Sequence, residues 1–198
     1  MIEWINFIIM ILTASIVLIT YVKSVSPAQL ERKIGEKAYK TCGRYRLISG
    51  FFMLIHLAQY GVYYFYPLQI DIPRFFPWNW WISIIIAVAI AIPSGYVWFR
   101  GMKDAGEETI FPKKEHTLYG GIYQKIRHPQ AAGEVWYWFI FAFILNSPFL
   151  VVFSTIWIPI FILMCVYEEK DLVLRYGNDY LKYRENTGFF LPKTLFAK

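Results

Sequence analysis

Charged residues are scarce in this sequence. Asp, Glu, Lys and Arg make up only 17% of its 198 residues, whereas 57% are hydrophobic and 20% are aromatic. Soluble domains carry about 25% charged residues, so this composition excludes an ordinary soluble protein and predicts an integral membrane protein. Low-complexity tracts, internal repeats and polar linkers are also missing, which excludes a separate soluble domain. We therefore expect one helical membrane domain over residues 1–198.

Cysteine is nearly absent, with only Cys42 and Cys165 in the chain. Both are expected on the cytosolic side, where disulfides are rare, and neither has the spacing of a metal-ligand motif. We expect no metal. The net charge of +6 suits an anionic inner leaflet and would also suit an anionic substrate. Membrane lipids are the expected neighbours, without a nucleic-acid partner, and the chain is expected to be a monomer.

Long apolar runs are what the sequence does have. A helix needs about 20 apolar residues to cross hydrocarbon about 30 Å thick, and four runs reach this length while a fifth is shorter. The expected spans are residues 4–22, 47–65, 78–99, 131–145 and 149–167. The predicted fold is thus an all-α membrane protein with five transmembrane helices. Its last two helices form a hairpin, because only Asn146-Ser147-Pro148 joins them.

Lysine and arginine are confined almost entirely to three segments: the first loop, residues 100–127, and the tail after Tyr167. Of the 20 basic residues, only Arg74 lies elsewhere. Because basic residues mark cytosolic loops, the N-terminus is expected outside and the C-terminus in the cytosol. Met1-Ile2-Glu3 lacks a basic n-region, so the first run is expected to be a retained helix. Ser26 before Pro27 predicts an N-capped cytosolic helix.

A few residues inside the expected spans interrupt the apolar pattern. His56 lies in the second span, where we expect it to hydrogen-bond between helices rather than to form a functional site. Pro93 and Pro159 are expected to kink their helices.

The expected hairpin brings two polar segments to the same depth. His128 lies 18 residues before Asn146, and Glu168 lies 20 residues after Pro148. With a rise of about 1.5 Å per residue, both are about 27 to 30 Å from the turn. Arg127-His128-Pro129 should therefore meet Glu168-Glu169 at the inner surface. Gly120-Gly121 permits a sharp turn just before Tyr123.

Each of these residues also has a simpler structural explanation. Arg127 and His128 can serve as anchors at the lipid boundary, and Asp171 can pair with Arg175 four residues later. Further motifs on the same hairpin ends favour a site instead. Together they are His116-Thr117, Gly121-Ile122-Tyr123, Arg127-His128-Pro129, Gly133, Glu168-Glu169, Leu172, Tyr176-Gly177 and Tyr180.

In their order and spacing, over about residues 100–192, these motifs resemble the isoprenylcysteine carboxyl methyltransferase family. That family belongs to a wider group with the phospholipid methyltransferases. The resemblance implies S-adenosylmethionine as methyl donor, held by cytosolic elements at about residues 100–130 and 168–195 in a pocket that the C-terminal tail closes. The implied cofactor-binding residues are His116, Thr117, Leu118, Tyr119, Tyr123, His128, Pro129, Gln130, Ala131 and Glu168.

Two positions depart from the family pattern. Ala131 stands where family members commonly have an aromatic residue, and Met164 replaces an arginine that contacts substrate in eukaryotic members. We expect Arg127 to supply the missing cation by neutralising the acceptor carboxylate. Arg127 and Glu168 are therefore the expected catalytic residues.

The resemblance implies methyl transfer to the C-terminal carboxylate of a prenylated cysteine or a similar lipid-anchored carboxylate that enters from the bilayer. A phospholipid N-methyltransferase is one alternative. An NADPH-dependent reductase of the sterol type is another, because those enzymes carry a similar Arg-x-Pro segment near a Gly-Glu pair, here Gly133-Glu134. A non-catalytic scaffold is the third. The small number of spans suggests a prokaryotic cell membrane.

Overall fold

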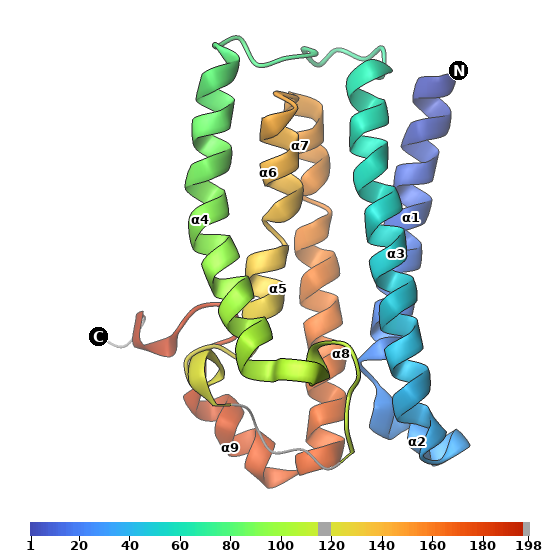
Figure 1. The fold of residues 1–198 in the computed structure, drawn as a ribbon, viewed down its shortest axis with the longest axis vertical. Helices are drawn as coiled ribbons and strands as arrows, with labels where there is room; N and C mark the ends of the chain where they lie inside the picture. Colours follow the sequence, from blue (N-terminus) through green and yellow to red (C-terminus); the bar gives the residue numbers. More distant parts are fainter. Residues whose placement is uncertain (115–119, 196–198) are drawn as a thin grey trace.

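The computed structural model describes residues 1–114 and 120–195, which form a bundle of helices without a β-strand. The elements, with η for 3-10 helices, are α1 (Ile2–Ser24), α2 (Pro27–Ile34), α3 (Lys37–Phe65), α4 (Trp80–Ala105), η1 (Gly106–Thr109), η2 (Gly121–Gln124), α5 (Pro129–Glu134), α6 (Tyr137–Ile144), α7 (Pro148–Ser154), α8 (Trp157–Tyr176), α9 (Asn178–Asn186) and η3 (Lys193–Leu195). The long helices stand side by side, and α2, η1 and α9 gather at one end (Figure 1). We call this end, together with η2, the basic end.

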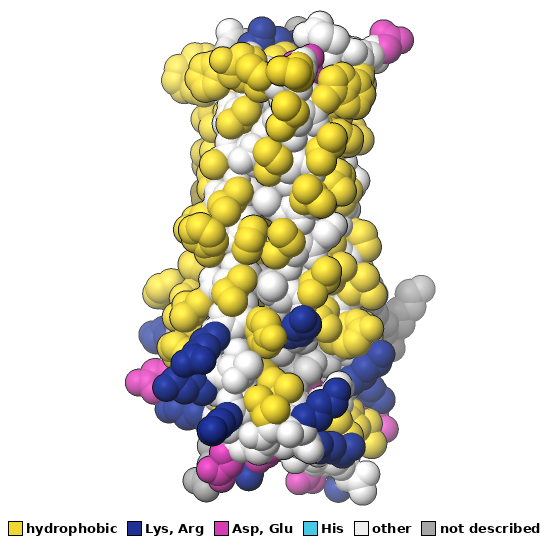
Figure 2. All heavy atoms as spheres, turned by 90° about the vertical axis from the view of Figure 1, so that its right-hand side faces the viewer, with side chains coloured by type: hydrophobic (Ala, Val, Ile, Leu, Met, Phe, Trp, Pro, Cys, Tyr) yellow, Lys and Arg dark blue, Asp and Glu magenta, His cyan; other side chains and the backbone are white. Residues whose placement is uncertain are grey.

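Among the described residues, four helical segments are long and apolar enough to cross a membrane: Ile2–Ser24, Lys37–Phe65, Trp80–Thr109 and Pro148–Tyr176. Their outward side chains are apolar, and Leu54, Ile85 and Ile92 are each 66 to 70% exposed. Figure 2 shows hydrophobic side chains over most of the bundle, with Lys and Arg gathered at the basic end. The predicted all-α membrane fold is therefore confirmed. Which end faces the cytosol stays a prediction.

The expected fifth span, residues 131–145, is not one continuous helix. The chain instead forms α5 and α6, which are six and eight residues long and separate at Val135 and Trp136. Gly133 explains the close packing at this point, because a Cβ there would lie 2.4 Å from the Ser94 carbonyl oxygen of α4. The sequence pattern missed this break because it depends on a contact with another helix.

The other arm of the hairpin is also divided, into α7 and α8. Pro159 has no N–H to donate to the Thr155 carbonyl, and Ile158 N donates to that oxygen instead, at 3.2 Å. The local pattern is thus tighter than an α-helix, as a proline predicts. Pro93, in contrast, lies inside α4, which runs unbroken from Trp80 to Ala105.

A buried cluster lies among the spans, and we call it the mid-bundle cluster: Thr13, His56, Tyr60, Trp138 and Trp157. His56 is fully buried, and its Nδ1 lies 2.8 Å from Thr13 Oγ1 of α1. The rings of Trp138 and Trp157 stack with their centroids 4.1 Å apart, and each centroid lies 4.9 Å from that of His56. The prediction that His56 hydrogen-bonds between helices is confirmed.

The short helix α2 is capped from a distant part of the chain. The backbone N–H groups of Ala28 and Gln29 donate to the Asp171 carboxylate of α8, at 3.2 and 3.0 Å. Ser26, the expected cap, makes no capping bond, and its hydroxyl donates to the Val22 carbonyl. Asp171 therefore fixes the place of α2 instead of forming the ion pair with Arg175 that its spacing allowed.

Candidate active site

The hairpin brings the two polar segments together, as the helix-rise argument predicts. His128 lies at the N-terminus of α5, and its Nδ1 is 3.2 Å from Glu168 Oε2 of α8. Its Nε2 is 3.1 Å from Glu169 Oε1. The turn between the arms is held by Ser147, whose hydroxyl accepts from Leu150 N at 3.3 Å. This short turn fixes the register of α5 and α6 against α8.

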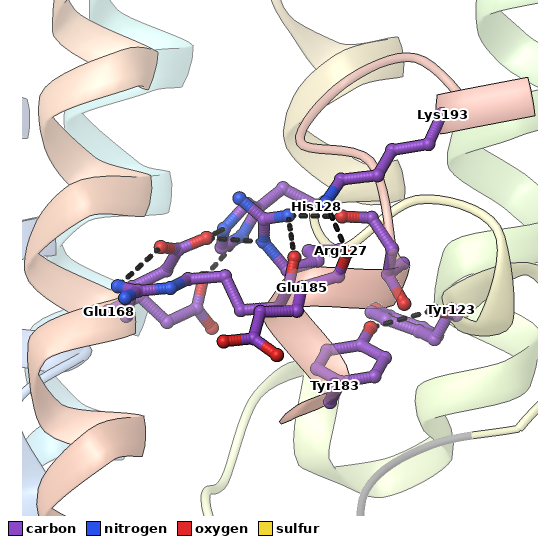
Figure 3. A network of polar contacts seen from close by, with 10 residues as sticks. Tyr123, Arg127, His128, Glu168, Tyr183, Glu185 and Lys193 are labelled. Carbon is purple, nitrogen blue, oxygen red and sulfur yellow. Dashed lines mark hydrogen bonds and ion pairs between the residues drawn. The ribbon is translucent and has the colours of Figure 1, made fainter. Parts of the chain in front are cut away.

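Arg127 connects the same glutamates to the end of the chain. Its Nε donates to Glu169 Oε1 at 2.6 Å, and its Nη1 donates to the carbonyls of Thr187 and Arg184. The guanidinium also lies over the Phe189 ring, 5.4 Å from its centroid. Figure 3 shows Arg127 and His128 at the centre of this network. All of these partners belong to the protein itself, so the expected action of Arg127 on an acceptor carboxylate stays a prediction.

The C-terminal tail after α9 packs directly against this pair. Arg127 N donates to the Gly188 carbonyl at 2.8 Å, and His128 N donates to the Phe189 carbonyl at 3.3 Å. The Phe189 ring meets the His128 ring edge-on, with centroids 4.8 Å apart. The tail thus covers part of His128.

A cavity opens at the basic end beside His128 and Glu168. Its empty space is about 1020 Å³, part of it open to solvent. It is lined by Tyr21, Val25, Pro27, Arg46, Ala105, Glu108, Thr109, Pro112, Tyr123, Arg127, His128, Gln130, Ala131, Phe161, Met164, Cys165, Glu168, Asp171, Leu172, Arg175, Tyr176, Tyr180 and Tyr183.

Most of the described site residues lie together in this cavity wall, including Tyr123, Gln130 and Ala131. Pro129 is different, because it is fully buried and packs behind the wall against Gly101 of α4. The remaining expected residues, His116, Thr117, Leu118 and Tyr119, lie outside the residues that the structure describes.

The wall on the side of α5 is built by local sequence features. Gly121 has a φ of +62°, which permits the sharp turn expected there, and Asp104 Oδ2 accepts from Ile122 N at 2.8 Å. Gln130 Nε2 lies 3.1 Å from the Tyr123 hydroxyl and 3.2 Å from Thr109 Oγ1. These bonds join α5 to η1 and η2, so three elements hold one wall.

The charges around His128 favour its protonated form. Burial acts to lower the pKa of this imidazole, but the Cys165 thiol and the carboxylates of Glu168 and Glu169 outweigh burial and raise the pKa well above its ordinary value. Glu168 is 37% exposed in its side chain, and its Oε1 has no hydrogen-bond partner within residues 1–114 and 120–195. One carboxylate oxygen therefore stays open to the cavity.

One group in this wall has the composition of a metal site. His128, Cys165 and Glu168 each offer a ligand atom, and these atoms lie within 4.8 Å of one another. Nitrogen, sulfur and carboxylate ligands of this kind suit zinc. The same atoms also hydrogen-bond among themselves, and the expectation that the protein uses no metal stays a prediction.

Sequence reasoning missed the contribution of the first helices. Tyr21 of α1 and Arg46 of α3 line the cavity, and Arg46 stands directly before the apolar run that begins at Leu47. In the sequence, that position indicates only the cytosolic side. Met164, the residue expected at the place of the family's arginine, is 1% exposed and also lines the cavity.

Comparison with protein families identifies a relationship over half of the chain. Residues 81–179 match a family model described as phospholipid methyltransferase. The match covers 99 of the 198 residues, from α4 to the start of α9, and includes Arg127, His128 and Glu168. Comparisons with curated proteins and with solved structures gave no significant match.

Proposed function

The chain belongs to the phospholipid methyltransferase family, and from this premise we propose that it methylates the carboxylate of a lipid-anchored acceptor, such as the C-terminal carboxylate of a prenylated cysteine. It is an integral membrane methyltransferase, and its family generally uses S-adenosylmethionine. The observation that carries the proposal is the cavity at the basic end, where His128 and Glu168 share a wall.

The cavity residues fit this methyl donor. A carboxylate with one open oxygen, Glu168 Oε1, suits an ammonium or sulfonium group. Six aromatic side chains in the wall offer flat surfaces to a purine: Tyr21, Tyr123, Phe161, Tyr176, Tyr180 and Tyr183. We therefore assign Glu168 and His128 to orienting the donor, and Tyr123, Gln130 and Ala131 to its wall. Pro129 supports that wall from behind, and His116 to Tyr119 remain assigned to the donor by resemblance.

Location at the lipid boundary serves the reaction. Bound S-adenosylmethionine would supply a methyl group carried on its sulfonium sulfur, and the rest of the donor would leave as a neutral thioether. An acceptor that is already a carboxylate anion needs no base. The chain must then bring a water-soluble donor and a lipid-anchored acceptor into line and exclude water. Its cavity lies between the solvated basic end and the apolar spans, and the tail covers His128 from one side.

The donor assignment is tested by calorimetry with S-adenosylhomocysteine. We expect Glu168→Gln and His128→Ala each to weaken its binding by about tenfold or more, because a charge-assisted contact is lost. Glu185→Gln is the matched control, since it makes the same chemical change at an exposed position of α9. Unchanged affinity in both cavity variants, with thermal unfolding like that of wild type, would remove both residues from the donor site.

A second candidate function has the amine of a phospholipid headgroup as acceptor, which the description of the matching family favours. The product separates the two reactions. Methyl transfer to a farnesylated cysteine analogue gives an ester that mild alkali hydrolyses, whereas transfer to phosphatidylethanolamine gives an alkali-stable amine. An alkali-stable product alone, with no ester from the farnesylated analogue, would replace the carboxylate proposal by the amine one.

A further inference from the structure

Arg46 is the one lining cation that α1 to α3 contribute to the described cavity wall. It lies nine residues into α3, about 14 Å along the helix from Lys37. Tyr21 lies beside it, with the guanidinium carbon of Arg46 5.9 Å from the centroid of the Tyr21 ring. The Glu168 carboxylate in the same wall is near enough to interact with the charge of Arg46. Arg46 therefore provides a positive charge on the side of the cavity that adjoins the apolar spans.

Hydrogen bonds hold the Arg46 guanidinium in place, without a direct ion pair to a described carboxylate. Nη1 donates to the backbone carbonyls of Glu108 and Thr109 in η1, both at 2.9 Å. Within residues 1–114 and 120–195, no carboxylate lies within 4.0 Å of this guanidinium to form an ion pair. Nε is buried and has no hydrogen-bond partner among those residues. A buried donor without a partner is costly, and a bound carboxylate at this nitrogen would remove that cost.

The two remaining nitrogens of the Arg46 guanidinium are placed so that they can bind one ligand together. With Nη1 bonded to the two carbonyls, Nε and Nη2 are left, and no hydrogen bond to either is found in the described part of the chain. These two nitrogens share one edge of the planar group. Two parallel N–H groups of this kind match the two oxygens of a carboxylate.

The other cations of the wall are less suited to this task. Arg127 is paired with Glu169 at 2.6 Å and bonded to carbonyls of the tail, and His128 lies between two glutamates. Arg175 donates to the Lys113 carbonyl, and it lies seven residues beyond Glu168, about 10 Å further from the spans. Among these four side chains, Arg46 alone combines an unpaired bidentate edge with a place beside the apolar wall.

We propose that the Nε and Nη2 edge of Arg46 binds the carboxylate of the lipid-anchored acceptor and holds it beside the donor. This assignment rests on the proposed function. A lipid chain in the bilayer must approach from the apolar side of the cavity, where Arg46 lies. The donor enters from water at the other side. The contact also holds the acceptor as its anion, which is the form that reacts.

Steady-state kinetics with a farnesylated cysteine analogue test the assignment. We expect Arg46→Gln to raise the KM for this acceptor by about tenfold or more, while the affinity for S-adenosylhomocysteine changes less than about twofold. The KM of Arg46→Lys should lie between those of wild type and Arg46→Gln, because an ammonium keeps the charge but lacks the two parallel N–H groups of a guanidinium. Arg44→Gln is the matched control, since Arg44 is exposed on the same helix.

Arg46 also supports η1, so its replacement could lower activity without any direct contact to the acceptor. A competition measurement separates acceptor binding from such a general loss of activity. Wild type should bind the carboxylate form of the analogue more tightly than its neutral carboxamide, and Arg46→Gln should lose that preference. Equal preference in wild type and Arg46→Gln would overturn the assignment. So would weaker S-adenosylhomocysteine binding with an unchanged acceptor KM, which would place the donor's own carboxylate at Arg46.

The outcome for wild type distinguishes failure of this inference from failure of the proposed function. If wild type forms an alkali-labile ester and Arg46→Gln does so with the same KM, the proposed function stands and only the Arg46 assignment falls. If wild type forms no ester with the carboxylate analogue, the proposed function falls and the assignment falls with it.

Discussion

The mid-bundle cluster and the site at the basic end are each built around a buried histidine. His56 is fully buried and His128 is 5% exposed, so burial does not distinguish them. Their surroundings do. His56 meets Thr13 and aromatic rings that fill the space around it, whereas His128 meets two glutamates beside a cavity. Paired charges next to open space therefore indicate chemistry here, and a buried polar residue by itself does not.

The largest effect that separates the two regions is expected from His56→Ala. Truncating a fully buried ring among Trp138 and Trp157 should lower the free energy of unfolding by about 2 to 4 kcal/mol, because it leaves a cavity. Calorimetry on the folded protein should still give the wild-type affinity for S-adenosylhomocysteine. Thr13→Val is the matched control, since it removes the hydrogen bond but keeps the volume, and should cost about 1 kcal/mol. If His56→Ala instead lost affinity for S-adenosylhomocysteine while keeping the stability of wild type, His56 would belong to the donor site, and the distinction between the two regions would be wrong.

A change of pH is expected to act on the basic end through His128. The pKa of His128 in the folded protein is raised above its ordinary value of 6.5. Its protonated ring therefore stabilises the fold fully below that value, and the contribution is lost as the pH rises through the folded pKa. Thermal unfolding from about pH 6 to about pH 9 should show a falling Tm in wild type and a smaller fall in His128→Gln. Identical pH profiles would contradict this effect.

The smallest effect is expected from Asp171→Asn, although Asp171 also lines the cavity. Both of its oxygens accept from the first N–H groups of α2, so losing the charge should cost about 1 kcal/mol, as for other helix caps. Hydrogen exchange should become faster in α2, and the affinity for S-adenosylhomocysteine should stay within about twofold of wild type. A larger loss of affinity would mean that Asp171 belongs with Glu168 in the donor site.

The sequence was sufficient for the parts of the fold that depend on length and distance along the chain. Apolar runs predicted the four long spans, and the helical rise predicted that His128 would meet Glu168. The break between α5 and α6 could not be predicted, because it accompanies the contact of Gly133 with α4. The cap of α2 by Asp171 was hidden for the same reason, since the two segments lie more than 140 residues apart.

The role of Arg46 was harder to see for a physical reason. In a soluble helix, apolar residues mark the buried face, but in a bilayer the face toward lipid is apolar too. Leu47, Ile48 and Phe51 are all exposed on α3, although their side chains would be buried in a soluble protein. The pattern along this helix therefore cannot tell which residues turn inward, and only the packed structure places Arg46 at the cavity.

Three acidic residues lie within about one turn of α8, and together they hold two other parts of the chain, namely Arg127-His128 with the tail and α2. Glu168 meets His128, Glu169 meets Arg127 with the tail, and Asp171 meets α2. Successive residues of a helix point about 100° apart, so the order of these residues in α8 sets how the two parts are oriented relative to each other. Loops elsewhere can change length at little cost, whereas adding or removing a single residue inside this turn would misalign several of these attachments at once.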